Sequence, residues 1–192
     1  QEDTDFDFSD NVNSFRFRTN SEGVYELESG VTGSFNVNNA LYDEGAPWSY
    51  AWGNYMYFPK GSECEVSYVE WGISNPDSIP GQTINILLLK WTDLDENQIA
   101  QANEREIVGF ASVLVNGDEG TGARWETELE NFNAPGDPIT LEDEGEYLVM
   151  FEYNAQGPVG VFLNASEEYD YSAVAFSSDE AWQMGMGKPA YQ

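Results

Sequence analysis

The chain has 192 residues, of which 35 are Asp or Glu, 7 are Lys or Arg and none is His, so its formal net charge is -28. The acid excess weighs against binding to nucleic acids or anionic lipid surfaces, which requires basic patches, and the missing histidine excludes every mechanism with an imidazole base or ligand. Hydrophobic residues make up 41% of the chain and aromatic residues 15%, too many for a disordered acidic tail, so the charge covers a folded surface.

The first half of the chain reads as short strands separated by turns. Apolar and polar residues alternate in several segments, which is the pattern of a half-buried strand. Asn, Gly and Pro mark the connections, for example at Pro59 and Gly61. The predicted strands cover residues 14–18, 24–28, 31–37, 48–58 and 64–73.

The second half contains the strongest predicted core strand, Thr83–Trp91. Its apolar side chains fall on both faces, with Ile84, Ile86 and Leu88 on one and Leu87, Leu89 and Trp91 on the other. Such a strand is covered on both faces, as in the middle of a sandwich sheet. The polar segment 93–104 is expected to hold a short helical turn. Further strands are predicted over 107–115, 124–132, 139–141, 146–153, 159–163 and 172–177.

Short strands with frequent turn signals predict an all-β fold, an antiparallel and jelly-roll-like β-sandwich. We expect one sandwich domain over 13–183, a flexible acidic N-terminal segment over 1–12, and a final strand or the start of a linker over 184–192. Acidic residues alternate with apolar ones along the strands, so most of the charge is expected on outward sheet faces and in turns. No run approaches the roughly 20 apolar residues of a membrane helix, so no membrane insertion is expected.

Three segments carry a resemblance to a known family: 52–59 (WGNYMYFP), 84–91 (INILLLKW) and 141–149 (LEDEGEYLV). They resemble strands that recur in this order in the β-sandwich, jelly-roll-like ectodomains of secreted Bacteroidota proteins. Many such proteins leave the cell by the type IX secretion system and serve as adhesins or accessory modules of exoenzymes. The resemblance implies an extracellular or cell-surface location and contact with the secretion machinery during export. It transfers no catalytic residues, because the family shares none.

A halophilic cytoplasm is the competing explanation of the acid excess. The chain has few lysines, namely Lys60, Lys90 and Lys188, as halophilic proteins do. Its many asparagines and aromatic residues fit that explanation less well.

The best candidate metal site is the acidic segment 93–104. Asp93, Asp95, Asn97 and Glu104 fall at positions one, three, five and twelve of an EF-hand-like loop, a spacing at which oxygen ligands surround one Ca²⁺. Gln98 stands where such a loop has glycine, and the flanking segments read as strands rather than paired helices. Both departures favour the alternative, an acidic surface loop with a helical turn. Weaker Ca²⁺ candidates are the alternating Asp3, Asp5 and Asp7 and the loop 116–120.

The best candidate ligand-binding group is aromatic. Trp48, Tyr50 and Trp52 share one face of an alternating strand, and Tyr55 is a candidate to join them. Flat rings on such a face stack on sugars. The alternative is that the face packs into the core, as large aromatic side chains mostly do.

Carboxylate catalysis is the remaining chemical alternative. Glycoside hydrolysis needs one acid of raised pKa in a pocket and a partner at a defined separation. The sequence singles out no such pair, and Glu70 beside Trp71 is the residue to inspect. Cys64 lies between Glu63 and Glu65, which oppose a reactive thiolate, so it is expected to be a small buried strand residue.

The sequence therefore predicts a non-catalytic binding or interaction module outside the cell. Its expected partners are a glycan or a cell-surface protein, and nucleic acid is not among them. Two alternatives stay open, a purely structural or cargo domain without a small-molecule ligand, and a carboxylate-dependent glycoside hydrolase.

Overall fold

The computed structural model describes residues 50–97, 99–153 and 159–164, together with short strands within 18–37 and at 182–183. Its regular structure there is β-strand with single turns of 3₁₀ helix, so the fold is all-β, as the alternation predicts. None of the helices in these residues is long and apolar enough to cross a membrane. The strands are β1 (Arg18–Thr19), β2 (Tyr25–Glu26), β3 (Val31–Val37), β4 (Tyr50–Phe58), β5 (Glu65–Val66), β6 (Tyr68–Gly72), β7 (Thr83–Trp91), β8 (Ile99–Ala100), β9 (Arg105–Leu114), β10 (Arg124–Glu128), β11 (Glu130–Asn131), β12 (Ile139–Thr140), β13 (Gly145–Tyr153), β14 (Val159–Asn164) and β15 (Trp182–Gln183).

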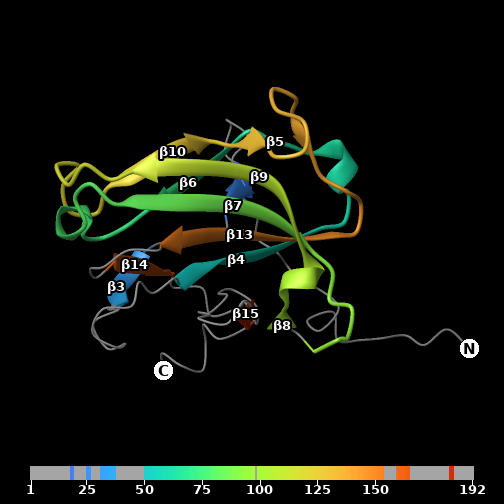
Figure 1. Cartoon of the computed structure of the whole chain (residues 1–192), viewed down its shortest axis with the longest axis horizontal. Coiled ribbons are helices and arrows are strands. Elements are labelled where there is room, and N and C mark those ends of the chain that lie inside the picture. Colours follow the sequence, from blue (N-terminus) through green and yellow to red (C-terminus); the bar gives the residue numbers. More distant parts are fainter. Residues whose placement is uncertain are drawn as a thin grey trace, which may run out of the picture.

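The main sheet has five antiparallel strands in the order β11-β9-β7-β13-β4. Figure 1 shows β9, β7, β13 and β4 running side by side across the molecule. β7 and β13 lie inside this sheet and carry its most apolar sequences, TINILLLKW and GEYLVMFEY. They pair directly, for example at Leu88 with Val149 and at Leu89 with Leu148. Strands buried on both faces are rich in such residues because neither face is left for polar side chains.

Both faces of β7 are buried, as its sequence predicts. Ile84, Ile86 and Leu88 belong to the larger core cluster, which also contains Trp71, Ile139 and Val149. Leu87, Leu89 and Trp91 belong to a smaller cluster on the opposite face, with Ala51, Ala100, Leu148 and Met150. We call the face that carries the larger cluster the inner face.

Two strand pairs cover the inner face and form the second layer of the sandwich. They are β6 with β10 and β5 with β12. Trp71 of β6 stacks on Trp125 of β10 at 4.6 Å and on Phe151 of the main sheet at 5.4 Å between ring centroids. These rings bring the two layers into one core.

The outward face of β6 and β10 is acidic, as expected for alternating strands. Trp125 and Thr127 are half-buried, whereas Glu126 and Glu128 are exposed. Glu70 of β6 is likewise exposed and lies directly opposite Glu126. This position places Glu70 on solvated sheet surface rather than in a pocket.

Reversing the charge at Glu70 is expected to stabilise the protein. Two carboxylates directly opposite each other on antiparallel strands repel, while opposite charges attract, so Glu70→Lys should add about 0.5–1 kcal/mol to the free energy of unfolding. Urea denaturation at low salt measures this difference. In the Glu126→Gln background the same substitution should gain less, and an equal gain there would contradict the pairing.

Two predicted strands are divided in the structure. Segment 64–73 becomes β5 and β6, with Cys64 half-buried in the turn before β5 rather than within a strand. Segment 124–132 becomes β10 and β11, which pair with β6 and β9 respectively, so the chain changes layer at Leu129. The predicted strand 172–177, most of 14–18, and the segments 1–12 and 184–192 lie outside the described residues.

Candidate metal centre

Three carboxylates converge in the connection between β7 and β9, which we call the acidic loop (residues 92–104). Its ends are held side by side, because Trp91 of β7 pairs with Arg105 of β9. Asp93, Asp95 and Glu104 each place one carboxylate oxygen within 4.8 Å of the other two. Asp93 is half-buried, Asp95 is exposed and Glu104 is buried. Three of the four residues singled out by their spacing therefore lie together.

Glu104 is the fixed member of this group. Its side chain is 5% exposed, and the residue ends the 3₁₀ helix η4 (Ala102–Glu104). Oε1 accepts a hydrogen bond from the backbone N–H of Leu94 at 2.9 Å, and Oε2 accepts one from the backbone N–H of Gln101 at 3.1 Å. Such charge-assisted bonds are strong, so the loop backbone sets the position of this carboxylate. A carboxylate has about four acceptor positions, which leaves capacity to bind a cation.

Asn97 is not placed as a metal ligand, although its spacing predicts that role, and it donates hydrogen bonds to the two aspartates instead. Its backbone N–H donates to Asp93 Oδ1 at 3.1 Å, and its amide Nδ2 donates to Asp95 Oδ2 at 2.9 Å. Gln101 Nε2 donates to the same Asp95 oxygen at 2.9 Å. Asn97 thus orients the two aspartates and presents its nitrogen, rather than its oxygen, to them.

Among the described residues of the acidic loop, Glu96 makes a sharp turn, with a φ of 57°. This is the left-handed region that favours glycine. The EF-hand pattern places its glycine at Gln98, which lies outside the described residues.

This geometry suits a hard divalent cation. Three carboxylates so close together repel one another, and a cation among them reverses that repulsion. Ca²⁺ prefers oxygen ligands at about 2.3–2.6 Å, so oxygens on opposite sides of one ion lie about 4.6–5.2 Å apart. The three oxygens, each within 4.8 Å of the other two, are close enough together to contact one such ion.

In the loop 116–120, the carboxylate of Glu119 binds the backbone of its own loop. The Glu119 carboxylate accepts the backbone N–H groups of Asn116 and Gly117, each at 2.7 Å. The bond from Asn116 is the main cause that lowers the pKa of Glu119. This carboxylate closes its own turn and faces the backbone rather than a cation. The third candidate, Asp3, Asp5 and Asp7, lies outside the described residues.

The structure describes the side chains of two of the four aromatic candidates, Trp52 and Tyr55, and these two do not share a surface. Trp52 is half-buried against the larger core cluster and stacks on Phe151 at 5.8 Å. Tyr55 packs against the smaller cluster, where its ring meets Trp91 edge-on at 5.9 Å and its hydroxyl donates to Glu146 at 2.9 Å. The two rings therefore lie on opposite faces of β4, and Tyr55 does not join a face with Trp52. Tyr50 begins β4, and Trp48 lies outside the described residues.

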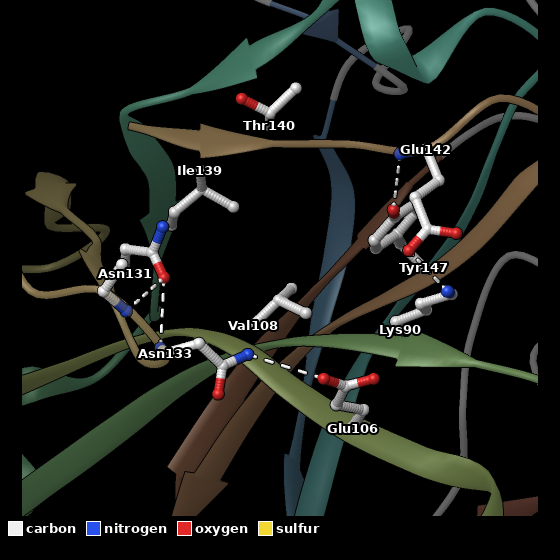
Figure 2. Close-up of a pocket in the computed structure, with 10 residues that line it drawn as sticks. Lys90, Glu106, Val108, Asn131, Asn133, Ile139, Thr140, Glu142 and Tyr147 are labelled. Carbon is white, nitrogen blue, oxygen red and sulfur yellow. Dashed lines mark hydrogen bonds and ion pairs between the residues drawn. The ribbon is translucent and has the colours of Figure 1, made fainter. Parts of the chain in front are cut away.

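A pocket that the sequence did not point to opens at one end of the inner face (Figure 2). Its volume is about 240 Å³, and we call it the polar pocket. One wall comes from Lys90 of β7, Glu106 and Val108 of β9, and Tyr147 of β13. The other comes from the segment 131–142. One feature of the sequence could have indicated the pocket. Lys90 continues the alternation of Ile84, Ile86 and Leu88, so it places a charge on the inner face.

Comparisons with protein-family models, with curated proteins and with solved structures find no match to this chain.

Proposed function

We propose that this chain is a non-catalytic interaction module of a secreted or cell-surface protein, and that its acidic loop binds Ca²⁺. The observation that carries the proposal is the convergence of Asp93, Asp95 and Glu104 within 4.8 Å. The all-β sandwich supports a module that presents loops from a rigid scaffold. The three strand segments that resemble Bacteroidota ectodomains support export, with the type IX secretion system as the proposed route.

An extracellular location and a Ca²⁺ site support each other. Extracellular Ca²⁺ modules bind the ion with Kd of about 10⁻⁴–10⁻³ M, which suits a site with few fixed ligands. In the acidic loop Glu104 is fixed by the backbone, while Asp95 is exposed and held by side-chain amides. An ion there would tie the exposed part of the loop to its buried end. The proposed partners of the stabilised module are glycans or cell-surface proteins.

Calcium is expected to raise the melting temperature of the protein. A ligand that binds the native state at ten times its Kd stabilises by about 1.4 kcal/mol. For a chain of this size that corresponds to a rise in Tm of about 3–6 °C. The measurement is thermal unfolding after EDTA treatment, with Ca²⁺ added to about 5 mM, several times the expected Kd.

Two controls separate a site from general screening of the net charge of -28. NaCl at equal ionic strength reports screening, which acts on all exposed charges. Mg²⁺ demands a tighter octahedral shell and should raise Tm less than Ca²⁺. An equal rise in Tm with all three salts, or no rise with Ca²⁺, would contradict a Ca²⁺ site. The acidic loop would then be a purely structural part of the domain.

A further inference from the structure

A row of polar side chains interrupts the inner face at the polar pocket. Lys90 pairs with Tyr147 of β13 on one side and with Glu106 of β9 on the other, so the three lie side by side on neighbouring strands. Lys90 is two residues beyond Leu88 and therefore faces the same way as the larger core cluster. Inner faces of sandwiches are normally apolar, and polar residues at such positions indicate function.

A β-bulge adjoins this row. Leu88 pairs with Gly109, but Leu89 pairs with Ile107, so Val108 is an extra residue in β9. Bulges bend a strand and re-aim its side chains, and they are frequent beside binding sites. Val108 packs at the edge of the larger cluster and, with Ile139, gives the pocket an apolar floor.

The polar groups of the pocket are held in place by hydrogen bonds (Figure 2). Lys90 Nζ lies 2.6 Å from Glu142 Oε1, and this bond raises the pKa of the Lys90 ammonium. The Tyr147 hydroxyl accepts the backbone N–H of Glu142 at 2.8 Å. Asn133 Nδ2 donates to Glu106 Oε1 at 3.4 Å. Tyr147 is buried, whereas Glu106, Asn133 and Glu142 are exposed, so the Tyr147 hydroxyl is the group that binds with least loss of side-chain freedom.

The turn after β11 is fixed in the same way. Asn131 Oδ1 accepts the backbone N–H groups of Asn133 and Ala134 at 3.1 and 3.0 Å. Asn131 Nδ2 donates to the carbonyl of Pro138 at 3.0 Å, which ties the turn to β12. Asn131 therefore braces the wall, while the exposed Asn133 side chain lies at its rim beside Glu106.

We propose that the polar pocket binds a single neutral sugar ring at the end of a glycan. Two carboxylates, Glu106 and Glu142, outweigh the one ammonium of Lys90 and repel anionic ligands such as phosphates or uronic acids. Lys90 forms an ion pair with Glu142, so of the two carboxylates only Glu106 remains to attract a cation. Sugar hydroxyls both donate and accept, so they match alternating carboxylates, amides and ammonium, and the apolar floor matches a C–H face of the ring.

The size of the pocket limits the ligand. Its volume of about 240 Å³ is smaller than the roughly 300–1,000 Å³ of sites that enclose drug-sized ligands. One ring fits, and the rest of a chain would extend into solvent. This inference gives a ligand class to the interaction module proposed above and rests on that proposal, but it concerns different residues from the acidic loop.

The test is a glycan array followed by calorimetry with the glycan that binds best. The array carries chains ending in glucose, galactose, mannose or N-acetylglucosamine, with sialic acid and aminated termini as charged comparisons. We expect binding to at least one neutral terminus. Glu106→Gln should weaken it about tenfold or more, since hydrogen bonds with charged groups contribute about 1.5–3 kcal/mol. Asn133→Ala should weaken it about twofold to tenfold, since hydrogen bonds between neutral groups contribute about 0.5–1.5 kcal/mol. Glu126→Gln, an acid on the outward face of β10, is the matched control and should bind as the parent does.

The variants are compared only where their melting temperatures match the parent, and Asn133 is exposed enough that its truncation should leave the fold intact. No binding to any neutral glycan, a preference for charged termini, or binding that both pocket variants retain would overturn the inference. Parallel assays in Ca²⁺ and EDTA keep the two sites apart. A Ca²⁺ response without glycan binding would contradict the sugar pocket but not the metal site. Glycan binding without a Ca²⁺ response would contradict the metal site but not the sugar pocket.

Discussion

Replacing Glu104 by alanine is expected to lower the free energy of unfolding by about 2–4 kcal/mol, because this buried carboxylate accepts hydrogen bonds from the backbone N–H groups of both Leu94 and Gln101. The same change should abolish the response to Ca²⁺. Urea denaturation with and without Ca²⁺ measures both effects. Glu104→Gln keeps the volume and one acceptor, so it should cost less stability while still losing the Ca²⁺ response.

Two milder variants separate the metal site from the structural role of Glu104. Asp95 is exposed, so Asp95→Asn should change stability in EDTA by less than about 0.5 kcal/mol, as surface substitutions do. It should nevertheless reduce the gain from Ca²⁺. Glu96→Gln changes an exposed acid of the same loop outside the carboxylate group and should keep the full gain. Equal losses in both variants would show that only the general charge of the loop matters.

Replacing Trp71 by alanine is expected to lower the free energy of unfolding by about 3–5 kcal/mol, the cost of removing a large aromatic core side chain. Trp71 is 7% exposed and stacks on rings from both layers, Trp125 and Phe151. Its indole N–H also donates to Thr127 Oγ1 at 2.9 Å. The substitution therefore opens a cavity where the two layers of the sandwich meet, and urea denaturation monitored by far-ultraviolet circular dichroism measures the loss.

Trp71→Phe divides this effect into its parts. It keeps a stacked ring but leaves Thr127 without its donor, so it should cost clearly less than the alanine variant. Trp125→Ala, at a half-buried position of the same stack, should fall between the two. A loss below about 1 kcal/mol for Trp71→Ala would mean that the layers are not held together at this point, since core aromatic truncations cost more.

Individual strands could be predicted from the sequence where the pattern of apolar residues within the segment was enough to define the strand. β3 and β7 coincide with the predicted segments 31–37 and 83–91, and the two-sided burial of β7 follows from leucine and isoleucine on both faces. The pairing of β7 with β13 was not predictable, because it depends on contacts between segments far apart in the sequence. The change of layer at Leu129 has the same origin.

The candidate sites divide in the same way. Spacing placed Asp93, Asp95 and Glu104 in one group, since a loop returning to the neighbouring strand brings its two ends together. The hydrogen bonds that fix Glu104 and turn Asn97 away from a ligand role arise from the loop's own backbone path, which spacing does not reveal. The sequence could have predicted that Trp52 and Tyr55 lie on opposite faces, because side chains an odd number of residues apart along a strand point to opposite sides of the sheet.

The most direct test of the metal site is a Ca²⁺ titration of the EDTA-treated, ¹⁵N-labelled protein followed by amide resonances. We expect shifts concentrated at the amides of Leu94, Asn97 and Gln101. The N–H groups of Leu94 and Gln101 donate to the Glu104 carboxylate, and that of Asn97 donates to Asp93, so each responds to an ion bound by these carboxylates. The shifts should saturate as one ion binds, and they should vanish in Glu104→Gln. Small shifts that never saturate and spread over the outward acidic faces of β6 and β10 would contradict a Ca²⁺ site in this loop.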